Sequence, residues 1–303
     1  MASLRELRSK IKSTKSTEQI TKAMKMVAAA RMRKSQLAIL AARPFAAKME
    51  KMVRELAQLE VRSDMAAKHE IQIHPFFDRR PDGAELLVLV TGDKGLCGAF
   101  NSNVIRASLE WFRQRRDRKT YCIAVGRKGR DVVARIKGQQ IETAFELVGI
   151  FPKITFVHAE MLGQAVLDAY LNKGVSKVTV LYNEFKSVAT QRLLTAEILP
   201  IPVPEVVPET GGEAAPLPDY GFEPGRQELL AELLPRHIKA QFYRILLESQ
   251  AAELASRMNA MDSASKNAKE MREGYVLDAN RTRQAMITKE IAELVGGAEA
   301  LAA

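Results

Sequence analysis

The chain has 303 residues, a hydrophobic fraction of 47% and a formal net charge of +10. No run of 18 apolar residues occurs, and the N-terminal stretch is charged throughout, so we expect neither a membrane-spanning helix nor a secretory signal peptide. Two cysteines, Cys97 and Cys122, are typical of a protein from a reducing compartment, where we expect both thiols to be free and buried.

The positive charge is concentrated at one end of the chain. Residues 1–48 contain twelve Lys or Arg and only two acidic residues, which accounts for the whole net charge of +10. Such an asymmetry predicts an acidic partner, which could be nucleic acid, an anionic membrane surface or an acidic protein surface.

The first predicted element is a long helix from about Ser3 to Leu59. Ser3 and Glu6 have the spacing of a capping box at its start. Apolar or small residues recur in alternating steps of three and four, which is the seam of a coiled coil and needs a partner helix. The seam residues are Leu4, Leu7, Ile11, Thr14, Ile20, Met24, Val27, Met49, Met52, Leu56 and Leu59.

The middle of the chain, residues 84–200, has the pattern of an α/β domain. We expect strands at 85–90, 119–125, 139–147, 176–185 and 188–199, with the last strand antiparallel to the fourth. We expect one helix that ends near 116 and two more that span 127–136 and 155–172. Apolar strands that alternate with helices predict a mostly parallel sheet covered on both faces.

A second helix with a coiled-coil seam is predicted near the C-terminus, from His237 to about Val295. If both helices return to one globular domain, they run antiparallel, and the numbers of paired residues add to roughly 295. Met24 would then lie opposite the region near Met271, and residues 296–303 would extend past the N-terminus. On periodicity alone, a purely structural zipper remains an alternative.

The fold class is therefore α/β, with a Rossmann-like domain joined to a long antiparallel two-helix coiled coil. Residues 200–224 hold seven of the twelve prolines and five acidic residues but no basic residue, which favours an extended or disordered linker. Pro235 is expected to break or restart the last helix, which begins near Glu228. The predicted parts are the N-terminal helix at 1–60, a connector at 61–83, the α/β domain at 84–200, the linker at 201–224 and the C-terminal helix at 225–303.

The glycine-rich loop 92–98, with the sequence GDKGLCG, follows the first strand, where a phosphate-binding loop would lie. It matches neither G-x-G-x-x-G nor G-x-x-x-x-G-K-[ST], and Asp93 would repel phosphate. We therefore favour a tight strand-to-helix turn that needs glycine, and a nucleotide-dependent α/β enzyme becomes the weaker interpretation.

Other candidate sites are weak. His69 and His74 are five residues apart but have no third ligand nearby, so we interpret them as exposed loop residues rather than as half of a metal site. No paired-carboxylate or nucleophile motif occurs. The sequence thus predicts no catalytic, cofactor-binding or metal-binding residues.

Several blocks of sequence resemble the gamma subunit of the rotary F-type ATP synthase, in its bacterial form. They are SKIKSTKSTEQITKAMKMVAAARMRKSQ at 9–36, TGDKGLCGAFN at 91–101, SRMNAMDSASKNA at 256–268 and ANRTRQAMITKEIAELVGGA at 279–298. The resemblance covers both ends and the middle, and the terminal blocks are highly specific to the family. The cysteine-pair insert of the chloroplast form is absent, which argues against thiol control.

The resemblance implies a central rotor shaft with no active site and no cofactor of its own. The coiled coil would stand inside a hexamer of alpha and beta subunits, and the globular domain would sit on the ring of membrane c-subunits beside the epsilon subunit. Hydrogen-ion flow would turn ring and shaft and so drive ATP synthesis in the beta subunits. The expected location is peripheral, on the cytoplasmic side of the bacterial plasma (inner) membrane.

The resemblance also implies five residues that contact the beta subunits. Arg283, Gln284 and Thr288 match the family's catch contacts. Met24 matches a position where an added charge disturbs coupling, and Arg257 lies in a matching block of the C-terminal helix. Each could equally be an ordinary residue on the surface of a coil.

One alternative function is a basic coiled-coil protein that binds nucleic acid. Such a protein needs Lys and Arg on a helix that is splayed from its partner. Here the basic residues lie on a helix whose seam continues through the same stretch, so that helix stays paired. We therefore expect no nucleic-acid partner.

Overall fold

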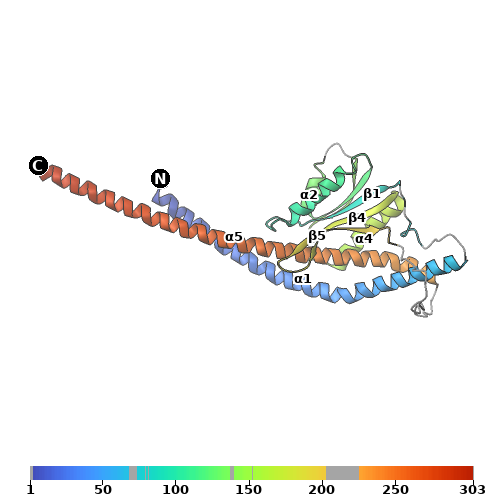
Figure 1. The fold of residues 1–303 in the computed structure, drawn as a ribbon. Helices are drawn as coiled ribbons and strands as arrows, with labels where there is room; N and C mark the ends of the chain where they lie inside the picture. Colours follow the sequence, from blue (N-terminus) through green and yellow to red (C-terminus); the bar gives the residue numbers. More distant parts are fainter. Residues whose placement is uncertain are drawn as a thin grey trace, which may run out of the picture. The chain divides into compact units, whose positions relative to one another are not determined.

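The computed structural model describes residues 3–67, 74–78, 80, 82–136, 140–151, 153–202 and 225–302. The chain divides into two compact units. Residues 1–30 and 257–303 form one, called here the terminal unit, and residues 31–256 form the other, called the sheet unit. Two long helices, α1 (Leu4–Ala67) and α5 (Arg226–Ala302), each contribute a segment to both units (Figure 1).

The sheet unit contains a five-stranded sheet in the order β3-β2-β1-β4-β5. Strands β1 to β4 are parallel, and β5 runs antiparallel to β4. This arrangement confirms the mostly parallel sheet and the antiparallel last strand that the apolar runs predict. The strands are β1 (Ala84–Val90), β2 (Thr120–Val125), β3 (Ile141–Leu147), β4 (Val175–Phe185) and β5 (Gln191–Leu199).

Both faces of the sheet are covered, because successive strand residues point to opposite faces. Val88 of β1 packs into a core shared with α4 (Phe156–Asn172) and α5, whereas Leu89 packs against α2 (Phe100–Arg113) and α3 (Arg127–Val133). Figure 1 shows α2 and α4 on either side of the strands. The sheet is thus the middle layer of the unit.

The first part of α5, which lies in the sheet unit, belongs to the larger of these two cores. Leu234, Ile238 and Phe242 are fully buried there, and Leu56 of α1 joins them. Pro235 lies inside α5 without ending it. The predicted break is therefore wrong, because buried residues on both sides of the proline hold the helix together despite the lost backbone hydrogen bond.

The first helix is longer than predicted, since α1 continues beyond Leu59 to Ala67 and also runs through Pro44. Two residues of the predicted connector are buried in the core. Phe76 and Phe77 are only 2% and 6% exposed and pack with the sheet.

His74 is half-buried, which corrects its interpretation as an exposed loop residue. Its Nδ1 accepts the backbone N–H of Phe76 at 3.2 Å, and the two rings meet edge to face with centroids 4.5 Å apart. Burial lowers the pKa of this imidazole. His69 lies outside the described residues, as do 203–224 of the predicted linker.

Candidate functional site

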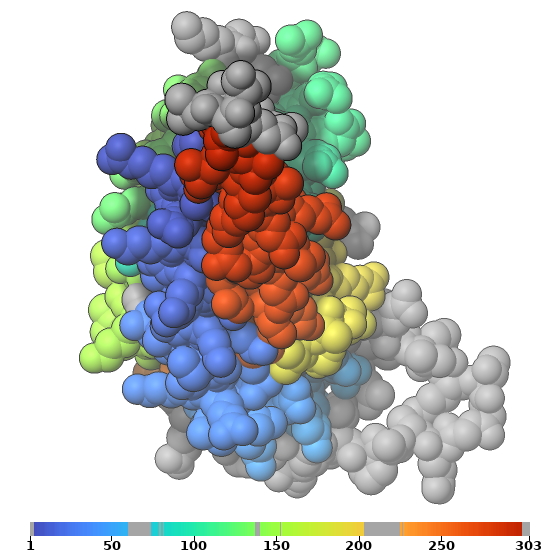
Figure 2. Space-filling model, turned by 90° about the vertical axis from the view of Figure 1, so that its left-hand side faces the viewer, coloured from blue at the N-terminus to red at the C-terminus, as the bar shows by residue number. Residues whose placement is uncertain are grey.

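The terminal unit is an antiparallel pair of helix segments from the two ends of the chain. Figure 2 shows the blue helix α1 beside the orange-red helix α5, and ion pairs join α1 to Asp262 and Arg272 of α5. The backbone N–H of Glu6 donates to Ser3 Oγ at 3.3 Å, and the N–H of Ser3 donates to Glu6 Oε2 at 3.2 Å. The predicted capping box is thereby confirmed, and it explains why α1 begins at Leu4.

Two ion pairs connect the helices of the terminal unit. Lys25 Nζ lies 2.6 Å from Asp262 Oδ1, and Arg272 Nε lies 3.1 Å from Glu18 Oε2. Hydrogen bonds from Lys25 and Lys266 lower the pKa of Asp262. The apolar part of this interface is narrow. Its most buried side chains are Leu7, Ala28, Met261 and Ala268.

These contacts set a register that differs from the predicted one. The numbers of paired residues add to between 285 and 290, as for Lys25 with Asp262, whereas roughly 295 was predicted. The predicted sum came from the ends of the two helices near Leu59 and His237, whereas the side-chain contacts along the pair fix the observed register. Met24 therefore lies near the level of Asp262 and not of Met271.

The end of α5 extends beyond the start of α1. Every side chain from Arg283 to Ala298 is exposed, because α1 has no residues left to pair with this stretch. This overhang is longer than the predicted one, which began at Gly296. Its large apolar residues are 46–74% exposed, and they are Met286, Ile287, Ile291, Leu294 and Val295.

The five residues predicted to contact a partner lie in two different settings. Met24 and Arg257 are half-buried. Arg283, Gln284 and Thr288 are exposed and follow one another within about one and a half turns of the overhang. There the Thr288 hydroxyl donates to the backbone carbonyl of Gln284 at 3.0 Å.

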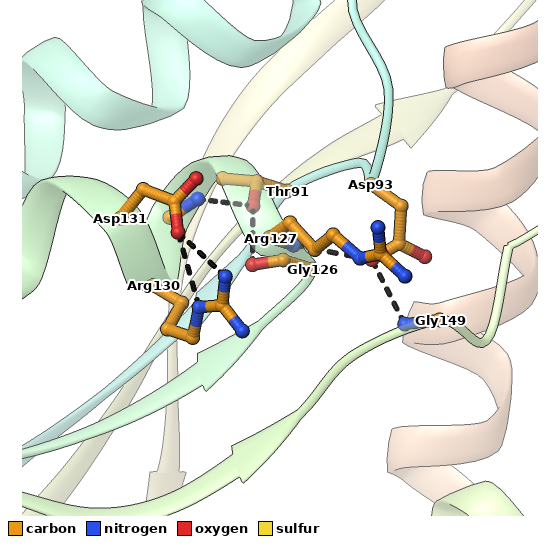
Figure 3. Close-up of polar contacts among 8 residues, drawn as sticks. Thr91, Asp93, Gly126, Arg127, Arg130, Asp131 and Gly149 are labelled. Atoms are coloured by element: carbon orange, nitrogen blue, oxygen red, sulfur yellow. Dashed lines mark hydrogen bonds and ion pairs between the residues drawn. The ribbon is translucent and has the colours of Figure 1, made fainter.

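A second candidate region is the loop that follows β1 in the sheet unit. Thr91 Oγ1 donates to the carbonyl of Val125 at 2.9 Å and accepts the N–H of Gly129 at 2.8 Å. It also lies 3.4 Å from the carbonyl oxygen of Gly126 (Figure 3). Gly126 has a φ of +84°, and a Cβ there would lie 2.1 Å from the carbonyl oxygen of Thr91. Only glycine fits this turn, so the loops after β1 and β2 are locked together.

The Asp93 carboxylate, also in Figure 3, accepts three backbone N–H groups from the loops after β2 and β3. Its Oδ1 accepts from Arg127 at 3.1 Å and from Gly149 at 2.9 Å, and its Oδ2 accepts from Phe151 at 3.2 Å. Many α/β proteins bind the phosphate of a ligand at this edge of the sheet. The sequence singled out this loop but missed this role, because the partners are 34 to 58 residues away.

The rest of the loop is attached to α5. The side-chain oxygen of Asn101 accepts the N–H of Gly92 at 2.8 Å, which closes the loop on itself. Ser256 of α5 donates its hydroxyl to the carbonyl of Cys97 at 2.7 Å. A small buried cluster joins the two elements and consists of Cys97, Phe100 and Ala252.

The titratable groups of the sheet unit are buried in ways that suit structure rather than catalysis. Both cysteines are free and buried, as predicted, and burial raises the pKa of Cys122 to about 12, so its thiol stays protonated. Burial lowers the pKa of His237, whose Nε2 lies 2.7 Å from Nε2 of Gln241. Burial raises the pKa of Glu248.

Two further features concern the residues that the structure describes. Within those ranges, no three His, Cys, Asp or Glu side chains are grouped so that they could hold a metal ion. Over the same residues, no helix combines the length and the apolar character that crossing a membrane requires.

Comparison with known proteins identifies the family. A family model described as ATP synthase matches residues 3–301. The ATP synthase gamma chain of Elusimicrobium minutum is 41% identical over 308 residues and 99% of each chain, and that of Chloroherpeton thalassium is 42% identical over 313 residues and 99% of each chain. The chain belongs to the ATP synthase gamma chain family.

A solved structure agrees with membership of the gamma chain family. A chain in the central stalk and c-ring of Tetrahymena thermophila mitochondrial ATP synthase aligns with a TM-score of 0.59 and 26% identity, over 81% of this chain and 99% of that chain. The gamma chain is a stalk subunit of a membrane-associated complex. The alternative of a nucleic-acid-binding protein finds no support in these comparisons.

Proposed function

We propose that this gamma chain is the central rotor shaft of a bacterial F-type ATP synthase and has no active site of its own. Hydrogen-ion flow through the membrane c-ring turns the sheet unit, and the paired helix ends carry the rotation to the catalytic beta subunits. Its partners in this proposal are the alpha–beta hexamer, the epsilon subunit and the c-ring. Family membership over 99% of the chain supports this assignment.

The observation that carries the proposal is the overhang of α5. Ile287, Ile291 and Leu294 are 48%, 56% and 74% exposed on a stretch of α5 that extends past the described start of α1. Apolar side chains at this spacing favour a surface that removes them from water. In the proposed complex the alpha–beta hexamer supplies that surface, and Arg283 and Gln284 contact the beta subunits at its edge.

The paired segment below the overhang suits a surface that must turn against its neighbours. No aromatic residue occurs before Phe45, and aromatic side chains are the usual anchors of tight interfaces. The basic residues of 1–48 attract acidic loops over a distance of about a Debye length. This attraction does not depend on one fixed docking position. Met24, Arg257 and Thr288 are the further beta-subunit contacts that we assign.

The complex holds this chain on the cytoplasmic side of the bacterial plasma membrane. The chain attaches there as a peripheral subunit through the c-ring. The high identity to gamma chains of Elusimicrobium minutum and Chloroherpeton thalassium supports the bacterial setting.

Co-purification tests the proposal. An affinity tag is inserted at the exposed turn after α2, next to Asp117, because a C-terminal tag would disturb the overhang. Detergent-solubilised membranes are expected to yield one complex that contains alpha, beta, epsilon and c-subunits and hydrolyses ATP. Filter binding with DNA and with ATP on the isolated chain serves as the counter-test. Recovery of the chain without alpha and beta, or tight DNA binding, would contradict the proposal.

A further inference from the structure

We infer that Asp93 is an internal anion: its carboxylate fills an oxyanion-binding cradle at the carboxyl edge of the sheet and positions the loop that holds α5. The cradle consists of the backbone N–H groups of Arg127, Gly149 and Phe151, which converge on the two carboxylate oxygens at 2.9–3.2 Å. Removing the carboxylate is therefore expected to open a site for inorganic phosphate. This inference concerns the sheet unit alone and does not depend on rotation.

The geometry of the cradle matches the chemistry of oxyanion recognition. Backbone N–H groups from successive loops hold phosphate in many α/β proteins, and hydrogen bonds to an ionised acceptor are stronger than those between neutral groups. A carboxylate and a phosphate both present pairs of negatively charged oxygens. The N–H groups that bind Asp93 can therefore bind phosphate once the side chain is absent.

The cradle is open enough to admit a small ion. Asp93 is half-buried rather than enclosed. Gly149 has a φ of +80°, and a Cβ built there meets no atom within 4 Å. There is therefore open space on the Cβ side of Gly149.

Asp93 is a positioning residue, because it holds the loop 92–98 in place. On one side, its carboxylate fixes the loop to the turns after β2 and β3. On the other side, the carbonyl of Cys97 accepts the Ser256 hydroxyl of α5 at 2.7 Å. Without the carboxylate, the loop keeps its attachment to α5 and the hydrogen bonds of Thr91 to Val125 and Gly129. It loses the hydrogen bonds that Arg127, Gly149 and Phe151 donate.

The test compares three variants of the full-length chain. Asp93→Ala removes both oxygens, and Asp93→Asn keeps one acceptor oxygen while its amide still fills the cradle. Asp131→Asn is the matched control, because that carboxylate has the same charge and lies nearby on α3, paired with Arg130 at 2.8 Å. It accepts none of the three N–H groups. Thermal melting is measured in sodium chloride and in sodium phosphate at equal ionic strength.

We expect Asp93→Ala to melt about 5 °C below the wild type in chloride, since three charge-assisted hydrogen bonds are lost. Phosphate should restore part of this loss, because a ligand that binds only the folded state stabilises it. Asp93→Asn should lose less and gain no more from phosphate than the wild type, which phosphate stabilises only through its general salting-out effect. Asp131→Asn should melt like the wild type in both salts. An Asp93→Ala variant that melts like the wild type, or that chloride and phosphate stabilise equally, would overturn the inference.

Hydrogen exchange of the same proteins localises the effect and covers the case in which Asp93→Ala does not fold. In Asp93→Asn, faster exchange confined to Arg127 and to 149–151 supports the inference, and unchanged exchange at those amides overturns it. Neither readout depends on assembly with other subunits. A failure here is therefore distinguishable from a failure of the proposed rotor function.

Discussion

The two units of this gamma chain are held together by different forces. In the sheet unit, all of β1 from Leu86 to Val90 is fully buried, and two apolar cores sandwich the strands. In the terminal unit, a narrow apolar seam is supplemented by partly exposed ion pairs such as that of Lys25 with Asp262, whose side chains are 42% and 33% exposed. Exposed ion pairs contribute about 0–1 kcal/mol each, so the terminal unit is the more weakly stabilised of the two.

This difference matches the separate demands on a base and a shaft. A base that receives torque must keep its shape, and burial of large apolar side chains provides that rigidity. A shaft that turns within a ring of subunits must be slender and must avoid tight anchoring. Its stability then comes partly from the subunits that enclose it. Mutations in the sheet unit should therefore lower the stability of the isolated chain, whereas mutations in the terminal unit should impair the activity of the assembled complex.

The largest effect is expected in the sheet unit for Phe242→Ala. Phe242 is fully buried in the core between α5 and the sheet. Its removal leaves a cavity and should lower the free energy of unfolding by about 4 kcal/mol, measured by urea denaturation of the isolated chain. Phe45→Ala is the control, because Phe45 is 59% exposed. A loss below about 1 kcal/mol for Phe242→Ala would remove the contrast between the units.

A functional effect without much unfolding is expected in the terminal unit for Met24→Lys. Met24 is half-buried beside the Lys25–Asp262 pair, so a new ammonium group would compete for Asp262 and for acidic loops of the beta subunits. ATP-driven proton pumping in membrane vesicles should fall several-fold more than ATP hydrolysis. Met26→Lys, at a neighbouring residue that is 61% exposed, should be milder. Equal loss of both activities in Met24→Lys would count against coupling at this position.

Two truncations of α5 sharpen the assignment of the overhang. Removal of residues 297–303 should leave ATP hydrolysis by the reconstituted complex nearly unchanged, because Arg283, Gln284 and Thr288 and most of the apolar stripe remain. Removal of 283–303 should reduce hydrolysis strongly while the melting temperature of the isolated chain stays the same. The reason is that every side chain described in this stretch, from Arg283 to Ala298, is exposed. A complex inactivated by the shorter truncation would show that the essential contacts lie at the extreme end.

The smallest effect is expected for Asp262→Asn. Hydrogen bonds from Lys25 and Lys266 lower the pKa of Asp262 below its ordinary value of 3.8. A carboxylate with a lowered pKa stabilises the folded state at neutral pH, and this contribution is lost as the pH falls through the folded value. The wild type should therefore melt slightly higher than the variant at pH 7, and the difference should vanish progressively below pH 3.8.

A matched control exists for this titration. Asp278→Asn changes an exposed carboxylate on the same helix and should leave the melting temperature unchanged both at pH 7 and below pH 3.8. A difference between wild type and Asp262→Asn that persists at low pH would show that Asp262 contributes through packing and not through its charge.

Local sequence patterns predicted the elements well, because the period of the apolar residues reflects which face is buried. The capping box at Ser3 and the five strands followed from residues close to one another in the chain. The register that places Met24 near Asp262 did not, since it depends on side-chain contacts between residues more than 200 positions apart. The burial of His74 and Phe76 was also missed, because a short polar-looking segment gives no periodic signal.

The candidate sites also include features that the sequence could indicate and features that only the folded chain reveals. The candidate contacts at Arg283 and Gln284 came from a resemblance to a family and stay a proposal, whereas the length of the overhang around these residues was not predicted. The role of Asp93 could not be derived from spacing, because its hydrogen-bond partners come from loops 34 to 58 residues further on. Only the parallel order of β1, β2 and β3 brings those loops to one edge of the sheet.

Observation of single complexes tests the shaft role most directly. A bead is attached through Arg106→Cys, an exposed position on α2, while the complex is fixed to glass through its beta subunits. The native thiols, Cys97 and Cys122, are buried and stay unlabelled. On addition of ATP, the bead is predicted to turn continuously in one direction. A bead that stays still on complexes that hydrolyse ATP would contradict the central claim.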